Sequence, residues 1–369
     1  MMKIAYISTA IVPSRTANSI NVMKMCQAFA KNGHQVKLFL PKYRNADALH
    51  NVYNYYDVER CFEIEWIPIN KSHKLSGHWY GLKAMLAVKK WKAELIYGRS
   101  LLTILLFSNN SSKAIYELHK PFSNKFLSYL LYYFTKNKLN KVVVISQALK
   151  NYTIEEYKID EEKIVVAHDG ADIPHYTKKA DLKVQGSRLK VGYVGHLYPG
   201  KSMEIISELV KCCKWVDFHI IGGLESDIDY WKEKLKNEQN IIFHGYLPHK
   251  QTEAYRLACD VLIAPYQRHV SVYGNNSIDI GKWMSPLKLF EYMASKKAIL
   301  TSDLPVLKEV LENDRNALLC SPDDINEWIR SLERLNSDIN LRNRLGENAN
   351  KDFIKNYTWN ARAKKILEH

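Results

Sequence analysis

The 369-residue sequence lacks the features that usually mark a secreted or membrane-spanning protein. Its six cysteines include no C-x-x-C pair and no zinc-type spacing, which favours free thiols over a disulfide framework. No run of eighteen or more uncharged apolar residues occurs, which argues against a membrane-spanning helix. The N-terminal sequence MMKIAYIST has no charged head, apolar middle or cleavage site of a secretory signal, so we expect a cytoplasmic protein.

Acidic residues are scarce in the first part of the chain. Residues 1–150 contain 22 Lys and Arg against 7 Asp and Glu, a net charge of +15, whereas residues 151–369 contain 31 against 32, a net charge of −1. An excess of one charge on one part of a protein indicates a partner of opposite charge. No recognised nucleic-acid motif occurs, so we expect an anionic membrane surface as partner and no nucleic acid.

Two segments of this basic part, His78 to Ala93 and Lys125 to Lys141, interleave lysines with aromatic residues. Such segments can lie at a bilayer interface, with rings at headgroup depth and ammonium groups on anionic lipids. The alternative for each segment is a helix that packs on a core and exposes a solvated basic face. Because the charge asymmetry favours membrane contact, we expect a peripheral location on the inner face of the cell membrane.

The length exceeds what one hydrophobic core usually organises, which predicts two domains. A strand pattern at Lys3 to Ser8 is followed by a helix pattern that ends at Gly33 and by a strand at Gln35 to Leu40. This β-loop-α-β unit predicts a parallel sheet with right-handed crossovers. Further strands of the same sheet are predicted at Leu95 to Tyr97, Ala114 to Leu118 and Lys141 to Ile145.

A second alternating series begins at Lys190, after a charged and irregular segment that we interpret as a hinge. Its predicted strands are Val191 to Val194, Phe218 to Gly222, Ile241 to Phe243, Val261 to Ala264 and Ala298 to Thr301. Its predicted helices are Met203 to Cys213, Tyr230 to Asn237, Thr252 to Ala258 and Pro286 to Ser295. We therefore predict an α/β protein with domains over 1–168 and 190–340, a hinge over 169–189 and a closing helix over 341–369 that crosses back to the first domain.

The segment Ser285 to Val310 carries the most chemistry. Ser285 is predicted to cap a helix through its hydroxyl, and Pro286 to occupy the first helical position. The backbone N–H groups behind them, from Leu287 on, would then point outward at the positive end of the helix dipole. Such a helix start suits a phosphate group.

One turn further along this helix, Glu291 is the only carboxylate beside an apolar face. A carboxylate in that position is a candidate for binding a ligand. The alternative is that Glu291 pairs with Lys288, three residues earlier, on a solvated helix.

This segment resembles the C-terminal motif of glycosyltransferase family 4, and other parts of the chain agree with it. GYVGHLYPGKS at Gly192 to Ser202 resembles the family's donor-phosphate loop, FHGYLP at Phe243 to Pro248 its nucleotide-binding turn, and DVLIAPY at Asp260 to Tyr266 the strand that follows. SRTANSINVMKMCQAFAKNGHQV resembles the family's first helix and turn. The resemblance implies the GT-B architecture, in which two doubly wound, Rossmann-like domains face each other across a cleft, and sugar transfer from a nucleotide donor with retention of configuration.

The resemblance also implies which residues bind the donor phosphates. Lys201, at the end of the loop that begins at Gly195, would stabilise the departing diphosphate together with the N–H groups of the Ser285 helix start. Many family members have Arg where this chain has His196, so this contact is neutral or conditional here. The alternative for Lys201 is an exposed lysine at the start of a helix.

Other parts of the donor site follow from the same resemblance. Glu291 would accept hydrogen bonds from the ribose hydroxyls, and the base, with uridine the commoner one, would lie against Tyr246 and Leu247 beside Gly222. The first Glu of the family's Glu-x7-Glu motif falls on Trp283, and an indole cannot replace a carboxylate. Trp283 and the nearby Asp279 are the candidates for a different contact with the sugar.

Five further residues are candidates in the first domain. His119 follows a strand together with Glu117 and resembles the family's cleft histidine, which would contact the donor sugar or acceptor hydroxyl; the alternative is a structural histidine. Arg15, Asn18 and Ser19 lie in the place of the family's first loop, where turn formation without a ligand is equally compatible. Arg99 follows another strand and is a further candidate.

These observations predict a retaining glycosyltransferase that acts on a lipid-linked or other saccharide in bacterial surface polysaccharide or glycoconjugate synthesis. We expect a nucleotide sugar as co-substrate and neither a metal nor another cofactor, because Asp227-Ile228-Asp229 is better explained by a helix start. The catalytic candidates are His119, Lys201 and Glu291. Two alternatives remain: a sugar-nucleotide epimerase or hydrolase with the same fold, and a non-catalytic basic binding module.

Overall fold

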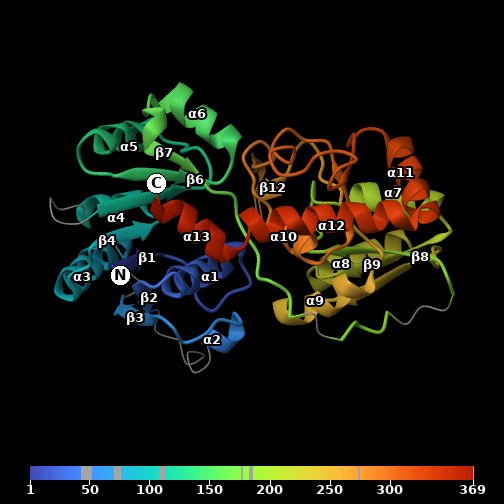
Figure 1. Cartoon of the computed structure of the whole chain (residues 1–369), viewed down its shortest axis with the longest axis horizontal. Coiled ribbons are helices and arrows are strands. Elements are labelled where there is room, and N and C mark those ends of the chain that lie inside the picture. The colour runs from blue at the N-terminus through green and yellow to red at the C-terminus, as the bar shows by residue number, and fades with distance from the viewer. Residues whose placement is uncertain are drawn as a thin grey trace. The chain divides into compact units, whose positions relative to one another are not determined.

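The computed structural model describes residues 1–42, 52–69, 76–107, 113–175, 178–182, 186–272 and 275–368. The chain divides into two compact units, one of Met1–Asp169 with Trp359–His369 and the other of Gly170–Thr358. Each unit contains its own parallel sheet covered by helices (Figure 1). The division after Asp169 lies next to the domain boundary that the sequence predicts at residue 168.

Unit 1 is built on a seven-stranded parallel sheet with the strand order β3-β2-β1-β4-β5-β6-β7. Its strands are β1 (Lys3–Ile7), β2 (Gln35–Lys42), β3 (Glu63–Pro68), β4 (Leu95–Gly98), β5 (Lys113–Leu118), β6 (Lys141–Val144) and β7 (Ile164–Val166). The order reverses at β1, which pairs with both β2 and β4. In doubly wound sheets, ligands bind beyond the carboxyl ends of the strands at such a reversal.

The helices of unit 1 come from both ends of the chain. They are α1 (Ala17–Lys31), α2 (Val52–Tyr55), α3 (Ser76–Trp91), α4 (Leu101–Phe107), α5 (Lys125–Asn137), α6 (Gln147–Tyr157) and α13 (Trp359–Glu368), with the short 3-10 helix η2 (Glu161–Lys163) before β7. Helix α13 packs against α1, although more than three hundred residues separate them (Figure 1). The central strands are apolar and buried, as helices on both faces of the sheet require.

Unit 2 contains a six-stranded parallel sheet with the order β10-β9-β8-β11-β14-β15. Its strands are β8 (Leu189–Val194), β9 (Val216–Ile221), β10 (Ile241–Gly245), β11 (Val261–Ala264), β14 (Ala298–Ser302) and β15 (Leu318–Cys320), and β12 (Ser271–Val272) and β13 (Asn275–Asp279) form a separate hairpin. Its helices are α7 (Met203–Cys212), α8 (Glu225–Lys234), α9 (His249–Ala258), α10 (Leu287–Ala294), α11 (Ile325–Ser337) and α12 (Ile339–Asn356).

The unit 2 core has two layers, one on each face of the sheet. Along β11, Val261 and Ile263 face the cluster that contains α7 and α11, whereas Leu262 and Ala264 face the cluster that contains α10. This alternation follows from the two-residue period of a strand. Because both faces are buried, the strand is apolar throughout and the sheet carries helices on both sides.

The predicted closing helix over 341–369 is wrong as a single helix. Two helices cover this range. Helix α12, in unit 2, ends at Asn356, and α13, in unit 1, begins at Trp359. Tyr357 packs its ring 5.1 Å from that of Phe290, and its carbonyl accepts the N–H of Ala171 at 3.0 Å. These contacts within unit 2 hold the backbone away from a helical path.

Two other boundaries differ from those predicted from the sequence. Most of the predicted hinge over 169–189 belongs to unit 2, where Leu182 is buried in the core and the Ala180 N–H donates to the Ala254 carbonyl at 3.0 Å. Helix α8 begins at Glu225, five residues before its predicted start at Tyr230, because its first turn is acidic and polar and shows no apolar period. The strands β3, β7 and β15 were not predicted from the sequence either, since they are short or half polar.

Candidate functional site

Three glycine turns meet at the carboxyl edge of the unit 2 sheet. The Gly195 N–H, after β8, donates to the Ile221 carbonyl at 2.9 Å, and the Gly222 N–H, after β9, donates to the Gly245 carbonyl at 2.8 Å. A Cβ on Gly222, which has φ 112°, would lie 2.4 Å from the Gly195 carbonyl oxygen. Only glycine therefore allows these turns to stack, and the backbone is left open for close approach by a ligand.

Two lysines gather at this edge around the ring of Tyr266. The Lys201 amine lies 5.8 Å from the centroid of that ring and the Lys288 amine 5.4 Å from it. Burial lowers the pKa of Lys201 to about 8. Burial and then the charge of Lys201 lower the pKa of Lys288 well below its usual value. The arrangement concentrates positive charge where it is poorly hydrated, which favours binding of an anion.

His196 lies on the same loop, with its ring 5.4 Å from that of Tyr198. Burial, followed by the charges of Lys201 and Lys288, lowers the pKa of His196 below 6.5. The imidazole is therefore neutral at physiological pH and contributes no charge to an anion site.

The start of α10 differs by one residue from the sequence prediction. Pro286 occupies the N-cap, with φ −77° and ψ 119°, and Leu287 is the first helical residue. Proline fixes φ but leaves ψ free, so an extended ψ moves it out of the helix. Ser285, buried one residue earlier, is not the capping residue that the sequence predicts. Since proline has no side-chain acceptor, the first N–H groups of α10 receive no cap from it.

Glu291 joins α10 to α9 through both of its oxygens. Oε1 lies 2.6 Å from Nε2 of His249, and Oε2 accepts Nη1 of Arg256 at 3.2 Å. Burial would raise the pKa of Glu291, but the charges of His249 and Arg256 outweigh it and lower the pKa to about 2. The alternative that Glu291 pairs with Lys288 on a solvated helix is therefore wrong, and neither actual partner was found from the sequence. A carboxylate has further lone pairs that remain able to accept ribose hydroxyls.

The remaining donor-side candidates lie on two loops. Tyr246 follows Gly245 and is 44% exposed, while Leu247 is half-buried against the core. Trp283 is half-buried in the loop before α10, where its backbone N–H donates to the Ile280 carbonyl at 3.0 Å. Oδ1 of Asp279 accepts the N–H groups of Val270 and Gly281 at 3.0 and 2.8 Å, so this oxygen shapes the loop.

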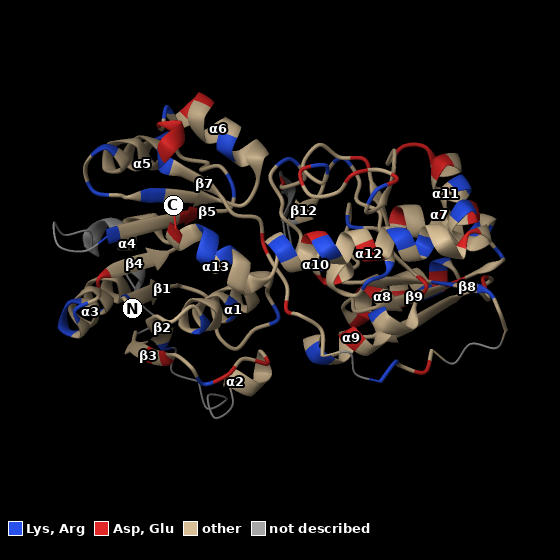
Figure 2. Ribbon diagram, in the orientation of Figure 1, with Lys and Arg blue, Asp and Glu red and all other residues tan. Residues whose placement is uncertain are grey.

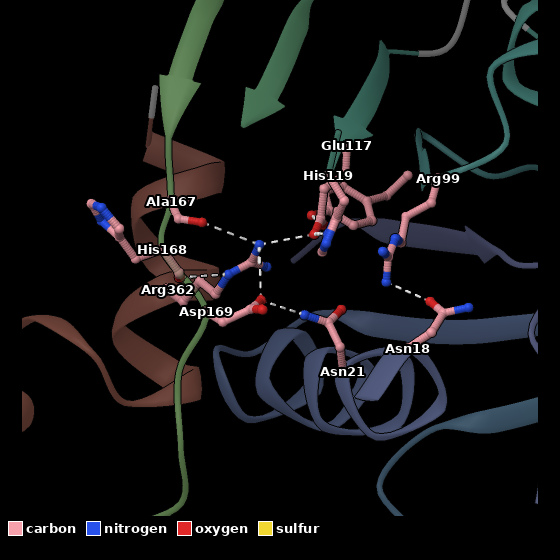
Figure 3. A network of polar contacts seen from close by, with 10 residues as sticks. Asn18, Asn21, Arg99, Glu117, His119, Ala167, His168, Asp169 and Arg362 are labelled. Atoms are coloured by element: carbon pink, nitrogen blue, oxygen red, sulfur yellow. Dashed lines mark hydrogen bonds and ion pairs between the residues drawn. The ribbon is translucent and has the colours of Figure 1, made fainter. Parts of the chain in front are cut away.

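In unit 1, His119 belongs to a buried polar network at the end of β5 (Figure 3). Its Nε2 contacts Oε1 of Glu117, whose other oxygen accepts the hydroxyl of Tyr97. The same Oε1 accepts Nη2 of Arg362, on α13, at 2.9 Å. Burial would raise the pKa of Glu117, but the charge of Arg362 and the hydrogen bond from His119 hold it well below 4.5.

This network fixes the protonation of the His119 ring. Burial and then the charge of Arg99 lower the pKa of His119, so the ring is neutral. Because Glu117 is ionised and can only accept, the proton lies on Nε2 of His119. Nδ1 then carries a lone pair, which can accept a hydrogen bond or a proton from a hydroxyl group.

The structure separates the candidates of the first loop. Nη1 of Arg99 donates to Oδ1 of Asn18, which brings these two residues together (Figure 3). Arg15 is exposed on the loop itself. Ser19 is fully buried, and its hydroxyl donates to the carbonyls of Ser14 and Thr16, both at 2.9 Å. The hydroxyl of Ser19 therefore shapes the start of α1, as the turn-forming alternative predicts.

Two family models match consecutive parts of this chain. The model of glycosyltransferase family 4 matches residues 20–174, and that of glycosyl transferases group 1 matches residues 175–352. The chain belongs to glycosyltransferase family 4. It is accordingly a transferase enzyme.

Relatives and solved structures agree with membership in family 4. An uncharacterized glycosyltransferase of Methanocaldococcus jannaschii is 29% identical over 277 residues, which are 69% of this chain and 66% of that protein. The O-antigen chain mannosyltransferase RfbU of Salmonella typhimurium is 27% identical over 209 residues, 55% of this chain and 53% of that protein. The chain thus matches about two thirds and about half of the length of these two relatives.

The fold is the GT-B fold of the family's solved members. The crystal structure of Anabaena HepE in complex with UDP and glucose aligns with a TM-score of 0.71 at 18% identity, and the alignment covers all of this chain and 99% of that one. Within the part of this family 4 chain that the structure describes, every helix is too short or too polar to cross a membrane. The described residues also form no group of three or more His, Cys, Asp or Glu that could hold a metal ion.

Proposed function

We propose that this enzyme transfers a sugar, with retention of configuration, from a UDP-sugar to a lipid-linked or other saccharide in the synthesis of a bacterial surface glycan. The observation that carries the proposal is the pair of lysines, Lys201 and Lys288, at the glycine turns of the unit 2 sheet. HepE, which has the same fold as this chain, was crystallised in complex with UDP and glucose. RfbU is an O-antigen chain mannosyltransferase. Both relatives support a nucleotide-sugar donor and a saccharide acceptor.

The proposed mechanism assigns one task to each group. Lys201 and the N–H groups at the start of α10 stabilise the negative charge that develops on the departing diphosphate. Glu291 binds the ribose hydroxyls, and the backbone near Tyr246 and Leu247 binds the base. His119, with its free lone pair on Nδ1, orients the acceptor hydroxyl in the first domain. The leaving diphosphate itself assists deprotonation of that hydroxyl, and the reaction needs no bound metal.

The first measurement should identify which nucleotide the protein binds. We expect UDP or its sugar conjugates at about a hundred times the dissociation constant to raise the free energy of unfolding by about 2.7 kcal/mol, a shift of a few degrees in thermal unfolding. The shift should disappear in Lys201→Ala and persist in Lys211→Ala, which removes an exposed lysine of α7. EDTA should leave it unchanged. GDP and ADP serve as comparisons, and the proposal is wrong if none of these nucleotides shifts the transition.

We also propose that unit 1 contacts an anionic membrane through α3 and α5. Helix α5 exposes four aromatic side chains, those of Phe126, Tyr129, Tyr132 and Tyr133. Helix α3 exposes Trp79 and Leu86 and ends with basic residues, whose blue segments are visible in Figure 2. Exposed rings next to lysines are typical of surfaces that lie at a bilayer interface. A membrane contact would bring the enzyme to lipid-linked acceptors.

A further inference from the structure

We propose that Lys288 is a second ligand for the diphosphate of the donor and acts together with Lys201. The inference rests on the proposed function, because it assigns a further residue to the same donor site. Lys288 lies in the first turn of α10, three residues before Glu291. The family motifs in the sequence do not identify it, and its role follows from its surroundings in the fold.

The amine of Lys288 is buried without an acceptor. Among the residues that the structure describes, its Nζ has no hydrogen-bond partner. Nζ of Lys288 lies 3.8 Å from the centroid of the Tyr193 ring. The face of an aromatic ring attracts a cation but is not a hydrogen-bond acceptor of the strength of an oxygen atom. An ammonium group has three donors, and leaving them unsatisfied in a buried position costs free energy. The site therefore lacks an acceptor, and phosphate oxygens would supply it.

Glu291 is the nearest acidic candidate on the same helix, but it does not fill this role. Its two oxygens already contact His249 and Arg256. Another carboxylate, that of Glu204 on α7, accepts the Gly200 N–H at 3.2 Å. The amines of Lys288 and Lys201 thus contact no carboxylate among the described residues.

The position of the amine links Lys288 to the donor-phosphate loop. A Cβ on Gly195 would lie 2.7 Å from Nζ of Lys288, so the amine lies directly against the turn after β8. Gly195 has φ 149°, and the absence of a side chain there leaves room for the amine. An anion at this turn would contact Lys288 from one side and the loop that ends in Lys201 from the other.

The protonation of the Lys288 amine should change when the anion binds. The titratable groups that surround the amine are those of Tyr193, His196, Lys201, Glu204, Tyr266 and Glu291. Burial and the charge of Lys201 hold the pKa of Lys288 low in the free protein, and a bound diphosphate would raise it again. UDP binding should therefore be accompanied by proton uptake.

The test compares the binding of UDP with that of uridine, which lacks phosphates. Titration calorimetry of the full chain in two buffers of different ionisation enthalpy gives the UDP affinity and the number of protons taken up, and saturation-transfer NMR follows uridine. We expect Lys288→Met to weaken UDP binding at least tenfold, to reduce proton uptake and to leave uridine binding unchanged. Lys288→Gln provides a second variant should the Met variant fold poorly, and Lys211→Met is the matched control.

The outcomes separate this inference from the proposed function. One outcome overturns the inference and leaves the proposed function standing. In it, the wild-type chain binds UDP, Lys201→Met does not bind UDP, and both Lys288 variants bind UDP with the affinity of wild type. Equal losses of UDP and uridine in the Lys288 variants would make the residue structural and also overturn the inference. If the wild-type chain binds no nucleotide diphosphate, the proposed function itself fails.

Discussion

The carboxylate of Glu291 combines a structural task with the proposed contact to ribose. Its side chain is 13% exposed and that of Arg256 only 6%, so the pair is shielded from water. Arg256 also donates to the hydroxyl of Thr252 at 2.7 Å. Removing the charge of Glu291 would leave the guanidinium buried without its counter-ion, which is much more costly than loss of a surface ion pair.

We therefore predict that Glu291→Gln lowers the free energy of unfolding of unit 2 by about 3 kcal/mol at pH 7. Urea unfolding measures this loss. The control is Glu208→Gln, an exposed carboxylate on α7, which should change stability by less than about 0.5 kcal/mol. A loss of similar size in both variants would contradict the assigned ion pair.

The same pair predicts a dependence on pH. The pKa of Glu291 is lowered from 4.5 to about 2 in the folded protein, so its contribution is present above pH 4.5 and is lost as the pH falls toward 2. The difference in stability between wild type and Glu291→Gln should shrink by about 1 kcal/mol between pH 7 and pH 3.5. A difference that stays constant over this range would contradict the depressed pKa.

Helix α13 contributes one buried arginine, Arg362, to the polar network of unit 1. Nε of Arg362 donates to the His168 carbonyl at 2.9 Å, and Nη2 contacts the Ala167 carbonyl, Glu117 and, at 3.9 Å, Asp169. Asp169 in turn accepts the amide of Asn21 at 2.7 Å (Figure 3). The helix thus contributes the cation that stabilises the carboxylate beside His119.

We predict that Arg362→Met destabilises unit 1 by about 3 to 5 kcal/mol, because the carboxylate of Glu117 then remains buried without the cation that it contacts in wild type. Hydrogen exchange should show the amides of α13 opening at lower free energy than in wild type. Lys364→Met changes an exposed lysine of the same helix and should leave exchange unchanged. Unchanged protection of α13 in the Arg362 variant would refute this account.

The uneven charge of the whole chain supports the proposed membrane contact of unit 1. The excess of +15 lies in residues 1–150, which all belong to unit 1. Exposed lysines near a membrane with anionic lipids contribute about 1 kcal/mol each at low salt, and the attraction weakens within a Debye length. The exposed rings of α3 and α5 lie in the same unit, where they would add apolar contact to the proposed membrane face.

We predict that the full chain binds vesicles that contain phosphatidylglycerol and not vesicles of phosphatidylcholine alone, with affinity that falls as salt rises. Reversing two charges of α3, in Lys89→Glu with Lys90→Glu, should weaken binding more than about tenfold. Lys232→Glu with Lys234→Glu makes the same change of charge on α8 of unit 2 and should have little effect. Equal effects of the two pairs would indicate general charge attraction and not a membrane face.

The sequence by itself determined most of the α/β framework and the location of the glycine turns in unit 2. Strands such as β11 and helices such as α7 were predicted within one or two residues, because their apolar periods arise from neighbours a few positions apart. The glycine turns after β8 and β9 were visible for the same reason. The short strands β7 and β15, with three residues each, were too brief to show a period.

The tertiary structure alone decided which groups meet. Glu291 and His249 are 42 residues apart, and Glu117 and Arg362 are 245 apart, so no local pattern could pair them. The break between α12 and α13 likewise depends on Tyr357 packing against Phe290. Periodicity reports only whether a side chain faces a core. Which partner it finds there, and hence the charge and hydration of Lys288, Glu291 and His119, depends on how distant elements pack together.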